Sequence, residues 1–284
     1  MGTELTREEQ LLCARATELA EASEYAVTTM PFLTPRERML VHDALIRCGR
    51  AERAFFWGGC RGCERTMAVF LPEWMITEPP PLPKGGYEGA FDPAREDWFV
   101  RMLTEDPSLR EEIPLQALQI TGSGFASLSH RDFMGSILAT GIERSVLGEI
   151  VVNESGALIF TTPEMAVYLT ENLTRIGRDA VKIQPAEPEA DSQIPRRYET
   201  VSVTAATPRI DGVVRALTNL SREDAAALVR SGMVERNYAV VLDVDRQITA
   251  GDVLTIRGYG KYRVDKTDEE TKRGRRRIVC RKYQ

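Results

Sequence analysis

Apolar positions in the N-terminal third of the chain recur at spacings that predict two helices followed by two strands. Three leucines seven residues apart, separated by charged side chains, predict an amphipathic helix over residues 6–23. A second helix is expected to begin at Thr34, whose hydroxyl can cap the helix end, and to stop at Gly49. Apolar runs at 54–57 and 67–71 predict two short buried strands.

The middle of the chain shows a more regular alternation of strand and helix patterns. The predicted elements are a strand at 115–121, a helix at 129–140, strands at 147–152 and 157–160, a helix at 163–176 and a strand at 180–183. This β-α-β-β-α-β order is that of ferredoxin-like domains, which include the RNA-recognition (RRM-like) modules. Those modules bind RNA through aromatic residues on a central strand. The first predicted strand has none, so the order alone does not indicate RNA binding.

The C-terminal third begins with two helices and ends in strands. An apolar run after Pro208 predicts the first helix. Ser221 and Asp224 have the spacing of a capping box at the start of the second helix, which Gly232 ends. Strands are expected at 233–236, 238–242 and 253–257.

Two stretches rich in proline or glycine, 76–93 and 185–195, separate these three regions. The length of 284 residues also favours more than one domain. We therefore predict a multidomain α+β protein, with a small N-terminal α/β domain at 1–78, a ferredoxin-like middle domain at 94–184 and an RNA-binding domain with a basic C-terminal extension at 200–284.

Composition places the chain among ordinary globular proteins, with 43% apolar and 28% charged residues. No window of 18 consecutive apolar residues occurs, and the N-terminal residues lack the apolar stretch of a secretion signal. Five cysteines are too few for a disulfide framework in a chain of this length. We therefore expect a cytoplasmic protein with reduced thiols and no membrane partner.

The net charge of −5 conceals an uneven distribution. Residues 1–192 hold 18 Lys and Arg against 30 Asp and Glu, a balance of −12, whereas residues 193–284 hold 19 against 12, a balance of +7. The densest basic run is 272–282, which is either a solvated tail or a functional patch. Screening over about 8 Å leaves the anion affinity of a separate basic domain largely intact.

Catalytic signatures are missing from the sequence. It contains no phosphate-binding glycine loop, no dinucleotide-binding glycine pattern, no nucleophile elbow and no zinc-protease motif. His130 follows a helix cap and suits a surface or capping role better than catalysis. Cys60 and Cys63 could form half of a zinc site or a redox couple, but neither a second ligand pair nor a thioredoxin-like context is present. We expect no enzyme activity, no metal and no cofactor.

Arg222 stands at the first position of a predicted helix, where the helix dipole disfavours a cation. A side chain placed against local preference suggests a use, and an arginine beside free helix-end amides can clamp a phosphate; the alternative is a solvated surface charge. Arg230 lies on the same helix and can share its basic flank. Further basic and tyrosine side chains could extend this surface, namely Arg209, Arg236, Arg257, Lys261, Tyr238, Tyr259 and Tyr262.

Several motifs of the C-terminal third resemble the S4 domain (the αL-type RNA-binding module), found in ribosomal protein S4, pseudouridine synthases and some tRNA synthetases. They are Arg209-Ile210-Asp211, Leu220-Ser221-Arg222 with Ala225, Ser231-Gly232-Met233-Val234 with Asn237, and Gly251-Asp252-Val253. Upstream motifs resemble the YlmH family of bacterial S4-domain proteins. They are Phe32-Leu33-Thr34-Pro35-Arg36-Glu37, Phe55-Phe56-Trp57-Gly58-Gly59 with Glu64-Arg65, Ser129-His130-Arg131-Asp132-Phe133-Met134-Gly135-Ser136 with Gly141, and Leu147-Gly148-Glu149-Ile150.

This resemblance implies a non-catalytic, ribosome-associated protein that binds rRNA and tRNA of the large subunit, in rescue of stalled complexes. It also implies RNA contacts at Arg209 and Arg222. The full set of expected RNA-binding residues is Arg209, Ser221, Arg222, Arg230, Arg236, Asn237, Arg257 and Lys261. The alternative is an RNA-modifying enzyme of pseudouridine-synthase type, but the G-R-x-D motif that such enzymes share does not follow the S4-like segment. We expect a monomer.

Overall fold

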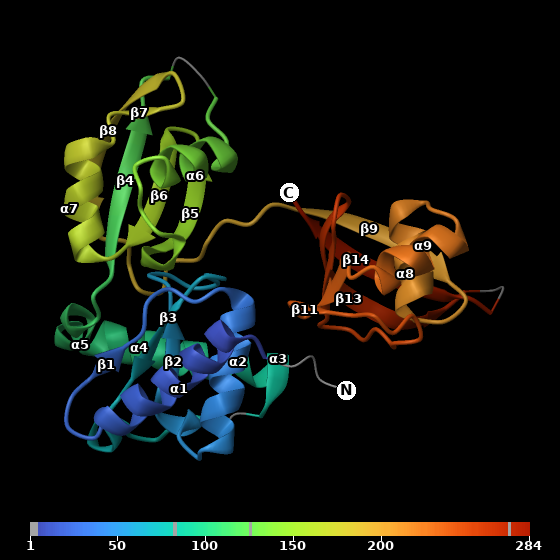
Figure 1. Cartoon of the computed structure of the whole chain (residues 1–284), viewed down its shortest axis with the longest axis horizontal. Coiled ribbons are helices and arrows are strands. Elements are labelled where there is room, and N and C mark those ends of the chain that lie inside the picture. The colour runs from blue at the N-terminus through green and yellow to red at the C-terminus, as the bar shows by residue number, and fades with distance from the viewer. Residues whose placement is uncertain (1–4, 82–83, 125–126, 272–273) are drawn as a thin grey trace. The chain divides into compact units, whose positions relative to one another are not determined.

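The computed structural model describes the chain except residues 1–4, 82–83, 125–126 and 272–273 (Figure 1). The chain divides into two compact units, unit 1 (Met1–Ile194) and unit 2 (Pro195–Gln284), so the boundary lies at the end of the second predicted linker. Both units combine helices with sheets, which confirms the α+β class. Among the described residues, no helix is long and apolar enough to span a membrane.

The N-terminal part of unit 1 combines helices with a three-stranded sheet. The strands are β1 (Thr28–Thr29), β2 (Ala54–Trp57) and β3 (Met67–Phe70), in the spatial order β1-β3-β2. The helices are α1 (Arg7–Ala22), α2 (Pro35–Arg47), α3 (Gly86–Ala90), α4 (Pro93–Glu105) and α5 (Pro107–Glu112), with single 3-10 turns η1 (Ala51–Arg53) and η2 (Glu73–Met75). The two predicted helices and two predicted strands are confirmed, whereas α3, α4 and α5 were not predicted.

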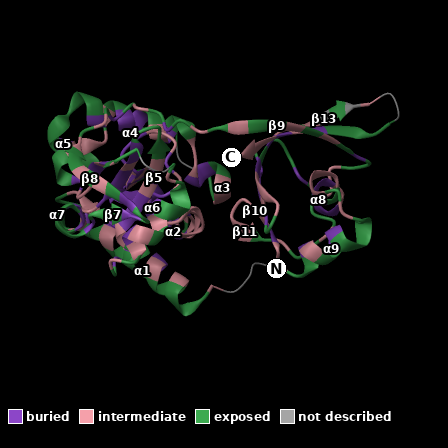
Figure 2. Ribbon diagram, turned by 90° about the horizontal axis from the view of Figure 1, so that it is seen from above, coloured by how far each residue is buried: buried purple, intermediate pink, exposed green. Residues whose placement is uncertain are grey.

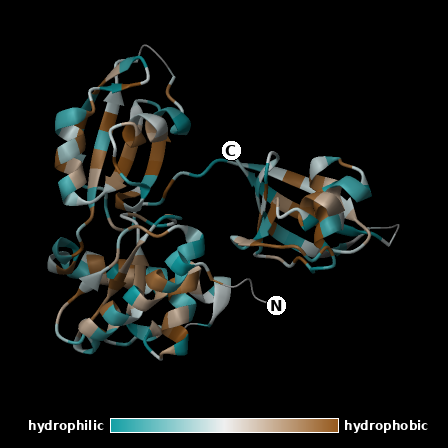
Figure 3. Ribbon diagram, viewed as in Figure 1, coloured by the Kyte–Doolittle hydropathy of each residue, from teal (hydrophilic) through white to brown (hydrophobic). Residues whose placement is uncertain are grey.

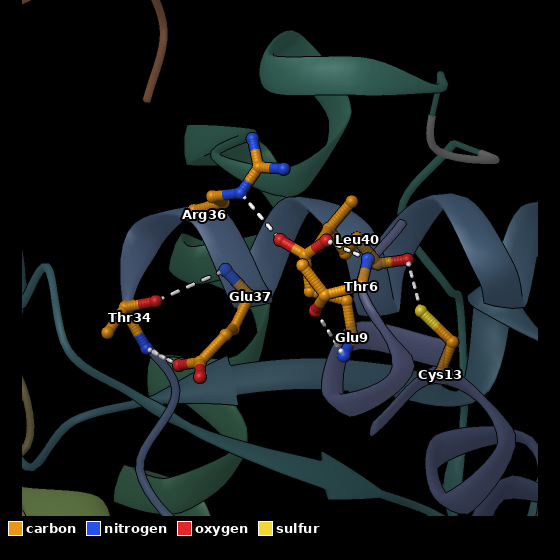
Figure 4. Close-up of polar contacts among 7 residues, drawn as sticks. All are labelled: Thr6, Glu9, Cys13, Thr34, Arg36, Glu37 and Leu40. Carbon is orange, nitrogen blue, oxygen red and sulfur yellow. Dashed lines mark hydrogen bonds and ion pairs between the residues drawn. The ribbon is translucent and has the colours of Figure 1, made fainter. Parts of the chain in front are cut away.

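Both predicted helix starts carry a capping box (Figure 4). The hydroxyl of Thr34 accepts from the Glu37 amide at 3.3 Å, and the Glu37 carboxylate accepts from the Thr34 amide at 2.6 Å. Thr6 and Glu9 make the same pair of bonds at the start of α1. The Arg36 guanidinium donates to Glu9 at 2.7 Å and holds the pKa of that carboxyl below its usual value. Local capping therefore fixes both helix starts, and one ion pair joins them.

The second sheet of unit 1 has five antiparallel strands in the order β5-β6-β4-β8-β7, with hydrophobic residues along its strands (Figure 3). The elements are β4 (Gln116–Gly122), α6 (His130–Leu138), η3 (Arg144–Val146), β5 (Leu147–Asn153), β6 (Gly156–Thr161), α7 (Pro163–Asn172), β7 (Arg175–Ile176) and β8 (Asp179–Ala186). The predicted β-α-β-β-α-β order is observed, with one strand added. Helix α7 stops at Asn172 because Leu173 is extended, which frees Arg175–Ile176 to pair with β8.

One hydrophobic cluster joins the two sheets of unit 1, and each sheet also packs its own helices in a separate cluster. The first two predicted domains therefore lie in one compact unit. Phe55 of β2 stacks on Trp98 and Phe99 of α4, and the same cluster includes Ala117 of β4 and Phe160 of β6. Figure 2 shows the buried residues gathered inside the unit. The described part of the predicted linker 76–93 lies within unit 1; Leu82 and Pro83 are outside the described residues.

Unit 2 packs two helices on one face of a six-stranded sheet, whose strands follow the order β11-β10-β12-β13-β14-β9. Its elements are β9 (Tyr198–Ala205), α8 (Ile210–Thr218), α9 (Arg222–Arg230), β10 (Val234–Arg236), β11 (Ala239–Val240), β12 (Val253–Ile256), β13 (Gly260–Glu270) and β14 (Arg276–Tyr283). The predicted helix pair and the first strands are confirmed, while β9, β13 and β14 were not predicted.

The basic C-terminal run forms a strand of this sheet. Strand β14 pairs with β13 on one side and with β9 on the other over its whole length. Ile278 and Cys280 are buried in the core, while Arg276 and Arg277 are exposed. The solvated-tail interpretation is therefore wrong for 276–283, because alternate apolar residues anchor this basic segment in the sheet. Lys272 and Arg273 of the same run lie outside the described residues.

Candidate nucleic-acid interface

A groove of about 730 Å³ lies in unit 2 between the edge strand β9, helix α8 and the start of α9. Among its described lining residues, the charged ones are four arginines and one aspartate: Arg209, Arg215, Arg222, Arg275 and Asp211. Two of the predicted RNA contacts, Arg209 and Arg222, are therefore brought together. A groove rich in arginine suits an anionic polymer such as the phosphate backbone of RNA.

Local sequence signals position three of these arginines. Arg209 is the N-cap residue of α8, and Arg215 lies in the last turn of the same helix. Asn219 adopts the left-handed conformation, with φ of 58°, which ends α8 and lets the chain turn. Ser221 then caps α9, since its hydroxyl accepts from the Asp224 amide at 3.1 Å, and Arg222 follows as the first helical residue.

Arg209 is held by two carboxylates. Its Nε and Nη2 atoms each donate to Asp211 at 3.1 Å, and Nη2 also pairs with Asp245. The hydrogen bonds to Asp211 raise the pKa of Arg209 above its usual value. The Asp211 side chain is only 7% exposed and accepts a further bond from the Gly212 amide at 2.8 Å. Arg209 thus neutralises a buried carboxylate and fixes the start of α8, besides facing the groove.

Arg215 and Arg222 differ from Arg209, because neither has a hydrogen-bond or ion-pair partner among the described residues. Both side chains are exposed. Arg275 is intermediate, since its Nη2 atom donates to the Thr204 carbonyl at 3.2 Å across the groove wall. Arg215 and Arg222 are therefore the groove cations whose charge no described carboxylate neutralises, so each can pair fully with a bound anion.

The remaining predicted contacts lie outside the groove. Arg236 donates to the buried carboxylate of Asp252 at 2.8 Å, and Asn237 donates to its other oxygen at 2.7 Å. The Asn237 side chain also accepts from the Val253 amide at 2.8 Å. This network fixes the turn after β10, so the structure gives Arg236 and Asn237 a stabilising role. Ser221, Arg230, Arg257 and Lys261 do not line the groove either.

The predicted stacking tyrosines do not act together. Tyr262 is 3% exposed and belongs to the core beneath α8 and α9, with Tyr259 packed against the same core. Tyr238 is half-buried, and its ring lies 4.7 Å from the Lys261 ammonium. The expectation that Tyr262 offers a stacking surface is wrong, because alternate strand residues point to opposite faces and Tyr262 faces the helices. Tyr259 lies in the turn before β13 and is partly buried.

Sequence reasoning missed Arg215 and singled out Arg275 only as part of the basic run. The groove side of α8 carries Asp211, Gly212, Arg215, Ala216 and Asn219. These spacings of one, three and four residues mark one face of a helix, so periodicity from Asp211 could have identified Arg215. Nothing in the sequence pairs Arg275 with this face, because it comes from the far end of the unit.

The cysteine pair of unit 1 is buried and close. The Cys60 and Cys63 sulfurs are 3.6 Å apart, and burial raises the pKa of the Cys63 thiol well above its usual value. Within the described residues, no group of three or more His, Cys, Asp and Glu side chains could hold a metal ion. His130 is exposed at the start of α6, where Ser129 and Asp132 make a capping box.

Residues 110–190, which contain the second sheet of unit 1, match the family model described as "Putative RNA-binding domain in YlmH". The "Ribosome-associated protein quality control protein P2" of Bacillus subtilis (strain 168) is 26% identical over 264 residues, covering 90% of this chain and 87% of that protein. The solved structure "Cell division protein ylmH from Streptococcus pneumoniae" is 18% identical with a TM-score of 0.44, covering 66% of this chain and 95% of that one. The match to the YlmH domain and the similarity along most of the B. subtilis protein confirm the resemblance seen in the sequence motifs: this chain is similar to the proteins of the YlmH family.

Proposed function

We propose that this protein is a non-catalytic RNA-binding protein that associates with the ribosome, and that its basic groove contacts rRNA or tRNA of the large subunit in stalled or rescue complexes. The observation that carries the proposal is the groove of unit 2, where Arg215 and Arg222 stand exposed without a described partner beside Arg209 and Arg275. The matched RNA-binding domain and the ribosome-associated relative support the same reading.

Unit 2 is, in this proposal, the S4 domain. The motif residues have connected roles: Arg209 and Asp211 form the ion pair at the start of α8, and Ser221 caps the helix that begins with Arg222. Asp252 holds the turn after β10 through Asn237. Ion pairing, helix capping and turn stabilisation each require a particular side chain at a fixed distance along the chain, which explains why the motif residues occur at this spacing. We likewise propose that the second sheet of unit 1 is a ferredoxin-like domain, on its strand order β5-β6-β4-β8.

Charge supports the assignment of the main RNA contact to unit 2 rather than to the matched domain. Residues 110–190 carry 6 Lys and Arg against 11 Asp and Glu, whereas unit 2 has the excess of +7. Sequence-independent RNA affinity comes mainly from cations that displace counterions from phosphates. The matched domain then contributes placement and shape recognition on the ribosome more than electrostatic affinity.

Gradient sedimentation of the full chain with ribosomal subunits and with stalled large-subunit complexes tests this function. We expect co-migration with the large-subunit complexes and crosslinks from unit 2 to rRNA or tRNA. The double variant Arg215→Ala/Arg222→Ala should lose most of the co-migration. Arg7→Ala is the matched control, because Arg7 is also an exposed first residue of a capped helix but lies in unit 1. Unchanged co-migration of a normally melting double variant would refute the groove as the site.

A further inference from the structure

The sheet of unit 2 has a second face, and no described helix of the unit covers it. Helices α8 and α9 pack on the opposite face, against core residues that include Val264, Ile278 and Cys280. Because side chains alternate along strands, the residues between these positions point away from the helices. This outer face is made of Tyr198, Thr200, Ser202, Thr204, Lys261, Arg263, Asp265, Lys266, Glu269, Arg277, Val279, Arg281 and Tyr283, on β9, β13 and β14.

Aromatic rings and cations alternate across one end of the outer face. The Lys261 ammonium lies 4.7 Å from the Tyr283 ring centre and the same distance from that of Tyr238. The rings of Tyr283 and Tyr198 meet edge to face, with centres 5.1 Å apart. The Arg281 guanidinium lies 5.1 Å from the Tyr198 ring centre. These contacts place the rings and the cations in one continuous, half-buried row.

The row is anchored, and the face around it is basic. Arg281 donates to both oxygens of Asp265 at 2.8–3.0 Å, and these bonds raise the pKa of the guanidinium. Arg263 lies beside Arg281 across the strand pair, is exposed, and has no partner among the described residues. Arg277 is exposed farther along the face, near the Glu269 carboxylate at 3.9 Å. Anchored rings lose little conformational freedom when a flat ligand stacks on them.

We propose that the outer face is a second RNA-binding surface, on which unpaired bases stack against Tyr198 and Tyr283 while Lys261 and Arg263 meet the adjoining phosphates. Tyrosine rings on a sheet beside cations are the combination that binds single-stranded nucleic acid, since every base has a flat face for stacking. A duplex hides those faces, so this surface takes unpaired RNA. The proposal rests on the proposed function in taking RNA as the ligand, and it assigns unpaired bases to two tyrosines, Tyr198 and Tyr283, that do not line the groove.

The test uses the full chain and three labelled RNAs of equal length: an unstructured oligoadenylate, the same oligomer without bases, and a blunt duplex. The abasic oligomer keeps every phosphate, so a preference for oligoadenylate measures base stacking alone. One stacked base supports a preference of about 5- to 150-fold. We expect wild type to show it, and Tyr198→Leu/Tyr283→Leu to lose it while binding the duplex as before.

Two further variants keep the result interpretable. Tyr198→Phe/Tyr283→Phe retains the rings and should keep the preference, and Tyr25→Leu removes a tyrosine of unit 1 that is 82% exposed and should change nothing. Arg263→Ala should lower the salt slope for oligoadenylate by roughly 0.7. If the leucine variant unfolds, photocrosslinking of the wild-type chain decides the question, with crosslinks on β9 and β14 expected.

Several outcomes would overturn the proposal. A leucine variant that melts normally and keeps its preference for oligoadenylate would do so, as would wild type that binds abasic and base-bearing oligomers equally. An outer-face variant that shifts the chain from dimer to monomer would show that this face binds a second copy instead. Failure of the wild-type chain to bind any of the three RNAs would contradict the proposed function itself. If the groove variant Arg215→Ala/Arg222→Ala loses duplex binding but keeps the preference for oligoadenylate over the abasic oligomer, the outer face is supported as a separate surface.

Discussion

Replacing Arg222 by alanine removes one of the two groove arginines that have no partner among the described residues. A guanidinium that neutralises one phosphate releases condensed counterions, so the variant should lower the slope of log K against log salt by roughly 0.7 to 0.9. Between about 50 and 200 mM salt, the affinity advantage of wild type over the variant should then shrink roughly threefold. Arg215→Ala should behave in the same way.

Arg209→Ala should behave differently, although the S4 resemblance places both arginines on the RNA. Asp211 and Asp245 already pair with the Arg209 guanidinium, so its interaction with a phosphate should be weaker than that of Arg222. Its loss should lower the salt slope less than the loss of Arg222. It should also lower the melting temperature, because the Asp211 carboxylate, 7% exposed, keeps only the Gly212 amide among the described residues.

Titration of a labelled RNA duplex by fluorescence anisotropy at four salt concentrations, with a thermal melt of each variant, measures both effects. The free energy of unfolding of Arg222→Ala should exceed that of wild type by a few tenths of a kcal/mol, because a cation is disfavoured at the start of a helix. Its melting temperature should therefore be slightly higher. Arg7→Ala is the control for a capped first-turn arginine in unit 1. The reasoning fails if Arg222→Ala keeps the wild-type slope, or if Arg7→Ala lowers the slope as much.

Four further predictions concern the units separately. Unit 2 alone should fold and retain most of the RNA affinity in a filter-binding titration, because it has its own core and the basic excess; stronger binding by unit 1 would contradict this. Asp252→Ala should cost about 1–3 kcal/mol in denaturant unfolding, because the buried carboxylate accepts from Arg236, Asn237 and the Thr249 amide, and these donors lose their acceptor; an unchanged free energy of unfolding would contradict the network role. Burial raises the pKa of the Cys280 thiol to about 12. Since the unfolded thiol ionises near 8.5, the melting temperature should fall as pH rises from about 9 toward 12, with a shallower fall in Cys280→Ala. Elemental analysis should find no stoichiometric zinc, since Cys60 and Cys63 lack two further ligands among the described residues.

Local interactions are what the sequence could reveal. The capping boxes at Thr6 and Thr34 involve residues three positions apart, and Ser221 caps the helix that begins at Arg222 over the same distance. The β-α-β-β-α-β order of the matched domain follows from periodicities within single elements. The charge difference between the two units follows from counting. Each of these features depends on neighbours along the chain, so each was predictable.

Strand pairing and shared cores were not predictable, because they join residues far apart in sequence. The alternation of Val201, Val203 and Ala205 is a strand signal, yet only the observed pairing shows that this strand borders β14. Charge counting left a solvated tail and a functional patch both open for the C-terminal run, whereas the structure shows that Ile278 and Cys280 anchor it in the sheet. The core of unit 1 likewise unites two regions that a stretch rich in proline and glycine seemed to divide.

The sequence by itself determined which residues begin the helices of this protein, which segments alternate as helix and strand, and that its cations gather in the C-terminal unit. Only the tertiary structure decided which of these cations line the groove. Arg275 reaches the groove by bonding to Thr204, 71 residues earlier, while Arg236 is drawn to Asp252 and away from the surface. A sequence records the charge of an arginine, whereas packing determines whether that charge pairs with a buried carboxylate or remains for a phosphate.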